Sequence, residues 1–128
     1  MNATVREWLA KAEGDYQVAR RESAVADGPC YDAVCFHAQQ CAEKLLKGAL
    51  IHYAVVPPKT HDLGVLQTLL LPHAAECRTP EEDLRFLTRA AVEYRYPGDS
   101  ATREDAVEAL RVCRDLRTRI LGSFGMPL

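Results

Sequence analysis

The polar side chains best suited to bind a ligand lie at helical spacing in the first half of the chain. Gln40, Lys44 and Lys47 fall on one side when residues 30–53 are plotted as a helix. Lysine supplies a point charge for a phosphate, and glutamine supplies an amide that both donates and accepts hydrogen bonds. This combination predicts a groove for a nucleotide phosphate and base. Ordinary solvation, with ion pairs at i, i+4 such as Glu43 to Lys47, explains the same residues without a ligand.

A second polar cluster follows this helix. Lys59, Thr60 and His61 directly precede a segment that Asp62 can cap as a helix. The free N–H groups and positive dipole end of a helix N-terminus favour an anion, so Lys59 and His61 are further candidates for a phosphate contact. Capping by Thr60 or Asp62, with His61 tethering the loop to the rest of the protein, is the alternative.

A third candidate pair, Arg95 and Tyr96, comes just before Pro97. A guanidinium and an aromatic ring can both stack on an unpaired base, as they do in single-stranded RNA recognition. The alternative is a helix end stopped by Pro97, with both side chains packed on their neighbours.

The sequence predicts no metal site, no cofactor and no catalytic residue. His37 and Cys41 are one helical turn apart, but a structural zinc site needs four ligands at recognised spacing. No motif links serine, histidine and carboxylate residues into a hydrolytic triad. The cysteines form an odd set without a CxxC spacing, which predicts reduced thiols in the core. They are Cys30, Cys35, Cys41, Cys77 and Cys113.

These candidate residues depend on helices that apolar periodicity predicts along the whole chain. Hydroxyl caps with an acidic residue three positions on mark helix starts at Thr4, Thr79 and Thr102. Asp62 caps a shorter helix. The expected helices run from Thr4 past Ala19, from about 30 to 53, from Asp62 to Pro72, from Thr79 to about Pro97, and from about 103 to 121.

The second of these helices is predicted to be covered on two sides. An apolar stripe that includes Val34, Ala38 and Leu45 faces the core. Three further apolar residues interrupt the polar side of the same helix, and a helix that is apolar nearly all round must be covered. We therefore expect them to contact a second subunit or a ligand, as a homodimer interface. They are Phe36, Leu50 and Ile51.

Four longer helices, one short helix and compact connections predict an all-α fold: an antiparallel up-and-down four-helix bundle with one additional short helix. The 128 residues are expected to form a single domain, 1–128. No long apolar run and no basic, apolar leader is present, which predicts a cytoplasmic protein without a membrane span. A net charge of −2 argues against broad, sequence-independent DNA binding but leaves room for a local basic patch.

One set of residues occurs in a characteristic order along the chain: Trp8, Ala12, Asp15, Phe36, Gln39, Gln40, Glu43, Lys44, Lys47, the run Lys59-Thr60-His61-Asp62-Leu63 and the run Arg95-Tyr96-Pro97. Through these residues the chain resembles the HEPN domain family, the higher-eukaryote and prokaryote nucleotide-binding domain, over almost its whole length. The order and spacing of the residues, rather than any single one, make the resemblance specific.

The resemblance implies a homodimer that binds a nucleotide or RNA. It also implies a minimal nucleotidyltransferase as protein partner in a toxin–antitoxin pair. Many active HEPN proteins are metal-independent ribonucleases in which four to six residues separate an Arg from a following His on a late helix. Here no His follows His73, and none has an Arg at that distance. We therefore expect a binding module without catalysis. A divergent ribonuclease that uses His61 or His37 as base, with Arg95 on phosphate, is the alternative, and a purely structural partner-binding antitoxin or scaffold is a third.

Overall fold

Five α-helices and one turn of 3-10 helix make up the fold in the computed structural model, which describes residues 1–128. There is no strand, so the all-α class predicted from the sequence is confirmed. Helices occur in each of the five predicted regions. The elements are α1 (Ala3–Ser23), α2 (Tyr31–His52), α3 (Leu63–Leu70), the 3-10 turn η1 (Ala75–Cys77), α4 (Glu81–Glu93) and α5 (Arg103–Ser123).

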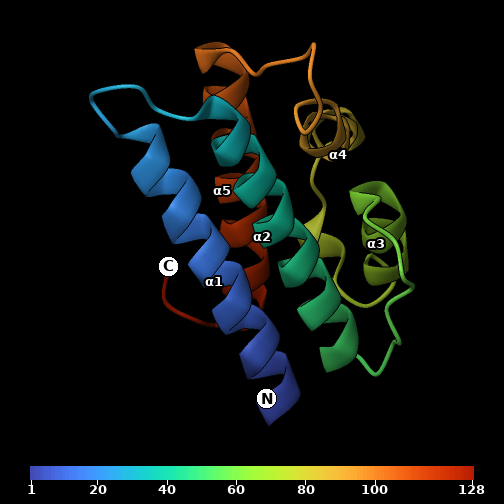
Figure 1. Cartoon of the computed structure of the whole chain (residues 1–128). Coiled ribbons are helices and arrows are strands. Elements are labelled where there is room, and N and C mark those ends of the chain that lie inside the picture. The colour runs from blue at the N-terminus through green and yellow to red at the C-terminus, as the bar shows by residue number, and fades with distance from the viewer.

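Helix α2 is the centre of the structure, because it packs against each of the other four α-helices (Figure 1). Its predicted apolar stripe is buried, as expected. The neighbouring face, which carries Cys35, Leu46 and Leu50, is also fully buried. Helices α3 and α4 of the same chain pack on α2, so this face needs no second subunit. Away from its two ends, α2 keeps a partly exposed strip, which consists of Phe36, His37, Gln40, Lys44, Lys47 and Ile51.

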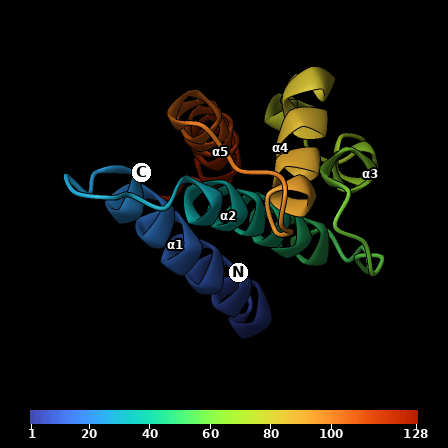
Figure 2. The ribbon, with the colours of Figure 1, turned by 45° about the horizontal axis from the view of Figure 1, so that its top comes forward.

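Among the four longer helices α5 is the fourth, so up-and-down alternation requires it to run parallel to α2. Helix α1 runs antiparallel to α2, whereas α5 runs in the same direction as α2 (Figure 1). The backbone N–H of Ala101, just before α5, donates to the carboxylate of Asp32 at the start of α2, over 2.7 Å. Eight residues make α3 about 12 Å long, too short to return along the 22-residue α2. Helices α3 and α4 instead form a pair beside α2, on the side away from α1 (Figure 2).

Two predicted caps are wrong. Asn2 rather than Thr4 caps α1, since its side-chain oxygen accepts from the N–H of Val5 over 2.8 Å and Thr4 lies inside the helix. Thr79 does not cap α4. Its backbone N–H and carbonyl are instead hydrogen-bonded by the side-chain amide of Gln67, over 2.8 and 2.9 Å. This contact fixes the α3–α4 connection.

The other two predicted caps are confirmed. Asp62 accepts from the N–H groups of Gly64 and Val65, and Thr102 forms a reciprocal capping box with Asp105 at the start of α5. Each arrangement satisfies N–H groups that have no partner within the helix, and a cap of this kind contributes about 1 kcal/mol. The Asp62 cap also fixes where the loop before α3 ends.

A continuous core of 30 residues draws on all five α-helices. All five cysteines are free, and four of them are buried. Burial raises the pKa of the Cys35 thiol to about 12, with Asp105 and Asp32 adding to the effect. Cys30 is exposed, contrary to the prediction that every cysteine lies in the core, because it precedes α2 in the loop. No helix combines the length and apolar character needed to cross a membrane.

Candidate functional site

The partly exposed strip of α2 lies over a buried carboxylate, Glu43. Its side chain is only 8% exposed and accepts three hydrogen bonds. Gln39 Nε2 and Lys47 Nζ, both from α2, each donate over 3.0 Å, and His61 Nδ1 donates from the loop before α3 over 2.8 Å. One carboxylate thus holds three polar side chains, of which only that of His61 is largely exposed.

The charge of Glu43 is retained in spite of its burial. Burial alone would raise the pKa of this carboxyl, but the hydrogen bonds from Gln39, His61 and Lys47 hold the pKa below its ordinary value. A buried carboxylate with charged and neutral donors around it is therefore ionised at neutral pH. It neutralises Lys47, so this lysine does not contribute a free positive charge.

His61 is fixed at one nitrogen and open at the other. Its backbone carbonyl accepts from Gln39 Nε2 over 3.2 Å. This hydrogen bond ties the loop to α2, as the alternative to a phosphate contact predicted. The imidazole is nevertheless 79% exposed, and its Nε2 atom makes no hydrogen bond within the chain. Tethering and availability for a ligand therefore coexist in this residue.

A second carboxylate, Asp15 of α1, organises the other part of the strip. Its oxygens accept from Lys44 Nζ over 2.6 Å and from His37 Nδ1 over 2.9 Å. The Asp15 side chain is 12% exposed, so this pair is only partly screened by water. The two lysines of α2 that were predicted to meet a phosphate, Lys44 and Lys47, are thus paired with carboxylates of the same chain.

A cavity of about 50 Å³ lies beside the strip, between α2 and α4. It brings together Gln40, His61 and Arg95, three of the residues predicted to bind a ligand. The Arg95 guanidinium also lies over the ring of Phe36, 5.8 Å from its centroid. The lining residues are Phe36, Gln39, Gln40, His61, Thr88, Ala91, Val92 and Arg95.

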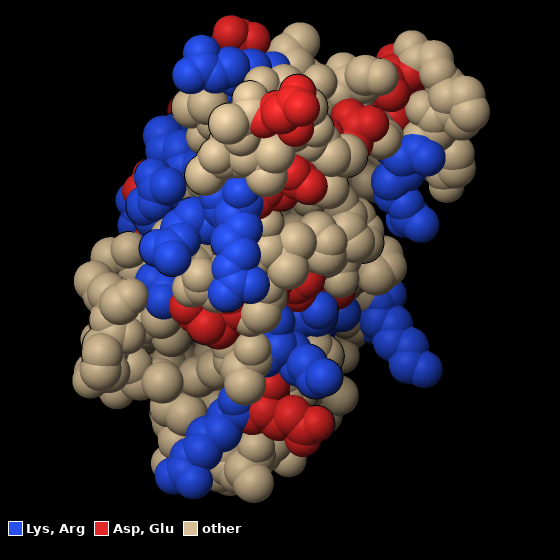
Figure 3. Space-filling view, turned by 60° about the vertical axis from the view of Figure 1, so that its left-hand side comes forward, with Lys and Arg blue, Asp and Glu red and all other residues tan.

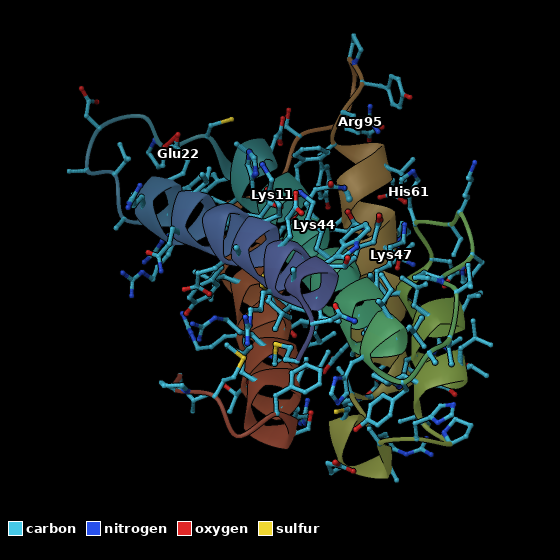
Figure 4. All side chains as sticks on the ribbon, turned by 90° about the horizontal axis from the view of Figure 1, so that it is seen from below. Lys11, Glu22, Lys44, Lys47, His61 and Arg95 are labelled. Carbon is cyan, nitrogen blue, oxygen red and sulfur yellow. The ribbon has the colours of Figure 1, made fainter.

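Two further candidates lie apart from this cavity. Lys59 and Tyr96 are exposed and do not line it. Lys59 belongs to the irregular loop after α2, and Tyr96 follows the end of α4. Figure 4 shows Lys11 on α1, Lys44 and Lys47 on α2, His61 in the loop before α3, and Arg95 after α4.

The predicted interface residues have three different environments. Leu50 has no exposed surface, so its assignment to a subunit interface is wrong: α2 is covered on that side by the protein itself. Phe36 lines the cavity described above. Ile51 is half-buried and packs against the core.

No group of three or more His, Cys, Asp or Glu side chains is arranged to hold a metal ion. Lys and Arg side chains are interspersed with Asp and Glu on the face shown in Figure 3, instead of forming one basic field. A face of this kind can orient an anionic ligand through a few specific contacts, but it does not attract nucleic acid over a wide area.

The HEPN domain model matches residues 5–122, which is nearly the whole chain. The chain belongs to the HEPN domain family. Two solved structures have the same fold as this HEPN domain. TT1696 from Thermus thermophilus is 25% identical, with a TM-score of 0.77, and the match covers 92% of this chain and 96% of that chain. ST0689, an archaeal HEPN homologue, is 26% identical, with a TM-score of 0.69 and coverages of 93% and 96%. No curated protein matches the chain.

Sequence reasoning missed Asp15 and gave Glu43 only as an ion-pair partner of Lys47, a pair that the structure contains. Asp15 and Glu43 carry the family resemblance, but the sequence assigned neither of them a role in the site. The sequence does contain a signal for Glu43. Because α2 must be covered on nearly all sides, an acidic residue on it needs hydrogen-bond or ion-pair partners. No local signal connects Asp15 with Lys44, because 29 residues separate them.

Proposed function

We propose that this HEPN domain binds a nucleotide or an RNA segment on the exposed strip of α2 and the adjoining cavity. The observation that carries the proposal is the convergence of Gln40, His61 and Arg95 on one cavity. An amide, an imidazole and a guanidinium can together contact a phosphate and the polar edge of a base. Lys44 and Lys47 contribute on the same strip, with Lys59 and Tyr96 as peripheral contacts.

The ion pairs on the strip determine what kind of binding we expect. Asp15 neutralises Lys44, and Glu43 neutralises Lys47. Arg95 makes no ion pair and is therefore the main net positive charge at the cavity. Binding should depend on a small number of directed contacts and fall only moderately as salt is added.

The binding test compares two arginines of α4 and the turn that follows it. Replacing Arg95 with Ala should weaken binding of a fluorescently labelled single-stranded RNA by about tenfold, measured by anisotropy, since charge-assisted hydrogen bonds contribute about 1.5–3 kcal/mol. Arg89→Ala is the matched control, because Arg89 pairs with Glu93 and does not line the cavity. Equal affinity of the two variants would contradict the proposed site.

We further propose that the domain acts in the cytoplasm as a homodimer and pairs with a minimal nucleotidyltransferase as a toxin–antitoxin system. The family membership supports this, because such arrangements are expected of many HEPN proteins. Light scattering should give twice the mass of one chain. A gene for a small nucleotidyltransferase next to this one, and co-purification of the two products, would support the partnership. A monomer that does not co-purify with the product of the neighbouring gene would contradict the proposal.

A divergent metal-independent ribonuclease is the second candidate function. One observation favours it: Glu43 holds Nδ1 of His61 and leaves Nε2 unbonded in the cavity that Arg95 lines. An imidazole oriented in this way could remove the proton of a ribose 2′-hydroxyl, while Arg95 stabilises the charge on the phosphate. His37, held by Asp15, is the other candidate base.

RNA cleavage assays decide between binding and catalysis. An enzyme of this kind should cleave RNA without added metal, leave a 2′,3′-cyclic phosphate and lose activity in His61→Ala. His73→Ala is the control, because His73 stacks on Tyr53 outside the cavity. Intact RNA over a range of pH, with unchanged binding, would favour the binding function.

A further inference from the structure

A larger groove lies on the other side of the α2 strip, between α1 and α2. Its volume is about 300 Å³, and it is lined by Thr4, Glu7, Trp8, Lys11 and Lys44. Ligand pockets in proteins typically span about 300–1,000 Å³, so this groove can hold a nucleobase, which the 50 Å³ cavity cannot. Lys44 belongs both to this groove and to the strip of α2.

The close contact between α1 and α2 holds Trp8 in the groove. Gly48 of α2 faces it: a Cβ atom at this position would lie only 3.1 Å from Cβ of Trp8. The absence of a side chain at Gly48 lets the two helices approach, and Trp8 is left half-buried. Trp8 lines the groove and is only partly covered by the protein, so its indole can still contact a ligand.

The charges around Trp8 are divided between the two ends of the groove. Lys11 is exposed and makes no ion pair, while Lys44 is held by Asp15. Glu7 also lines the groove, and its carboxylate can accept a hydrogen bond from the amino group of a base. A phosphate is favoured near Lys11 and Lys44 and disfavoured near Glu7. Aromatic stacking beside a lysine is the combination used for single-stranded nucleic acid.

We propose that the Trp8 groove is a second subsite of the same binding face, and that the ligand is a single-stranded oligonucleotide, not a mononucleotide. This inference rests on the proposed function. The strand crosses α2 from the Arg95 cavity, places a base on Trp8 and sets the adjoining phosphate against Lys11. Figure 4 shows Lys11 on α1, Lys44 on α2 and Arg95 after α4.

The spacing along α2 suits this path. Gln40 lines the small cavity and Lys44 lines the groove, and they are one helical turn, about 6 Å, apart. Stacked nucleotides rise about 3.4 Å each along a strand, so the two subsites are within reach of neighbouring or next-neighbouring nucleotides. A mononucleotide can occupy only one of them.

Trp8 is the only tryptophan of the chain, so intrinsic fluorescence reports on this groove alone. Single-stranded RNA should quench it, with an affinity that increases with length from a dinucleotide upward, whereas AMP should leave it almost unchanged. Trp8→Phe should retain part of the affinity, and Trp8→Leu should lower the affinity for RNA by about tenfold or more, since stacking on one base has an effect of this size.

A second variant avoids dependence on Trp8, which also packs on α2. Lys11→Ala should weaken RNA binding severalfold and reduce the slope of log affinity against log salt by about 0.7, the value for one phosphate contact with a single strand. Arg21→Ala is the matched control, because Arg21 is an exposed arginine near the other end of α1, next to Glu22, far from the groove (Figure 4).

The failures of the two proposals can be distinguished. RNA binding that depends on Arg95 but neither quenches Trp8 nor responds to Lys11→Ala would overturn the Trp8 subsite and leave the proposed function standing. A complete absence of RNA binding would overturn both. Loss of the dimer in Trp8→Leu, without quenching by RNA, would show that the groove is a protein contact and would also overturn the subsite.

Discussion

Two buried ion-pair networks in this protein resemble each other in composition and differ in what they leave exposed. Glu43 joins α2 to the loop before α3, and Glu13 joins α1 to Arg117 of α5. Arg117 donates to both Glu13 oxygens, over 2.9 and 3.0 Å, and to the carbonyl of Leu128 over 3.1 Å. Its guanidinium also covers the Tyr16 ring, 4.5 Å from the centroid.

The difference shows why burial of a charge does not by itself mark a functional site. The Arg117 guanidinium is occupied by Glu13, Tyr16 and the C-terminal segment, so this network has an obvious structural role. The Glu43 network instead leaves His61 Nε2 unbonded at the edge of a cavity. In both networks the pKa of the carboxyl is lowered, because each carboxylate accepts hydrogen bonds from strong donors. The open polar atom and the cavity, not the ion pair, distinguish the candidate site.

Arg117→Ala should have the largest effect on stability. It removes a guanidinium that is 8% exposed and leaves Glu13 without its partner, and breaking a buried pair costs about 3–5 kcal/mol. Because the Glu13 side chain is 40% exposed, we expect about 2 kcal/mol, measured by urea unfolding. RNA affinity of the folded variant should be unchanged. An affinity loss as large as that of Arg95→Ala would remove the distinction between the two networks.

Glu43→Gln should have a smaller effect on stability and should strengthen RNA binding. The amide retains some hydrogen bonds, so we expect a loss of about 1–2 kcal/mol in the free energy of unfolding. Lys47 is then no longer neutralised, and affinity for single-stranded RNA should rise, with a salt slope steeper by about 0.7. Unfolding curves and anisotropy titrations measure the two effects. Weaker RNA binding in a folded Glu43→Gln protein would mean that the carboxylate itself contacts the ligand.

The smallest expected effect is the pH dependence of stability. Hydrogen bonds lower the pKa of Glu43 and Glu13 in spite of their burial, and Arg117 is the principal donor to Glu13. A carboxyl with a lowered pKa stabilises the fold above its unfolded pKa, about 4.3, and this contribution is lost as the pH falls through the folded pKa.

Acid titration can separate the two networks. Stability of the wild type should be nearly level from neutral pH to about 5 and fall below about pH 4.3. Glu43→Gln should show a shallower fall than the wild type, because one of the two contributing carboxyls is gone. Identical acid profiles, measured by thermal unfolding, would mean that Glu43 has the same pKa in the folded and unfolded chain.

Local patterns in the sequence were sufficient to predict much of the fold. Apolar periodicity placed all five α-helices, and the caps at Asp62 and Thr102 were readable because each acts on the residues that directly follow it. The predicted cap at Thr79 failed because Gln67, twelve residues earlier, takes its backbone groups.

In the candidate site, too, some residues could be predicted from local spacing and others could not. Gln40, Lys44 and Lys47 share one side of α2 because helical spacing requires it. That His61 and Arg95 lie at the same cavity depends on the packing of α4 and of the loop, which no local pattern specifies. The pairing of Lys44 with Asp15 is equally distant in sequence. Leu50 was predicted to be available for a subunit interface because its helix was considered without α3 and α4, which cover that side of α2.

An NMR titration of the isotopically labelled wild-type protein with single-stranded RNA tests the central claim most directly. The side-chain amide signals of Gln39 and Gln40 and the Nε–H signal of Arg95 should shift as RNA is added, while the Nε–H signal of Arg117 should stay in place. Shifts at Arg117 with none at Gln40 and Arg95, or no shift anywhere, would contradict a binding face on α2.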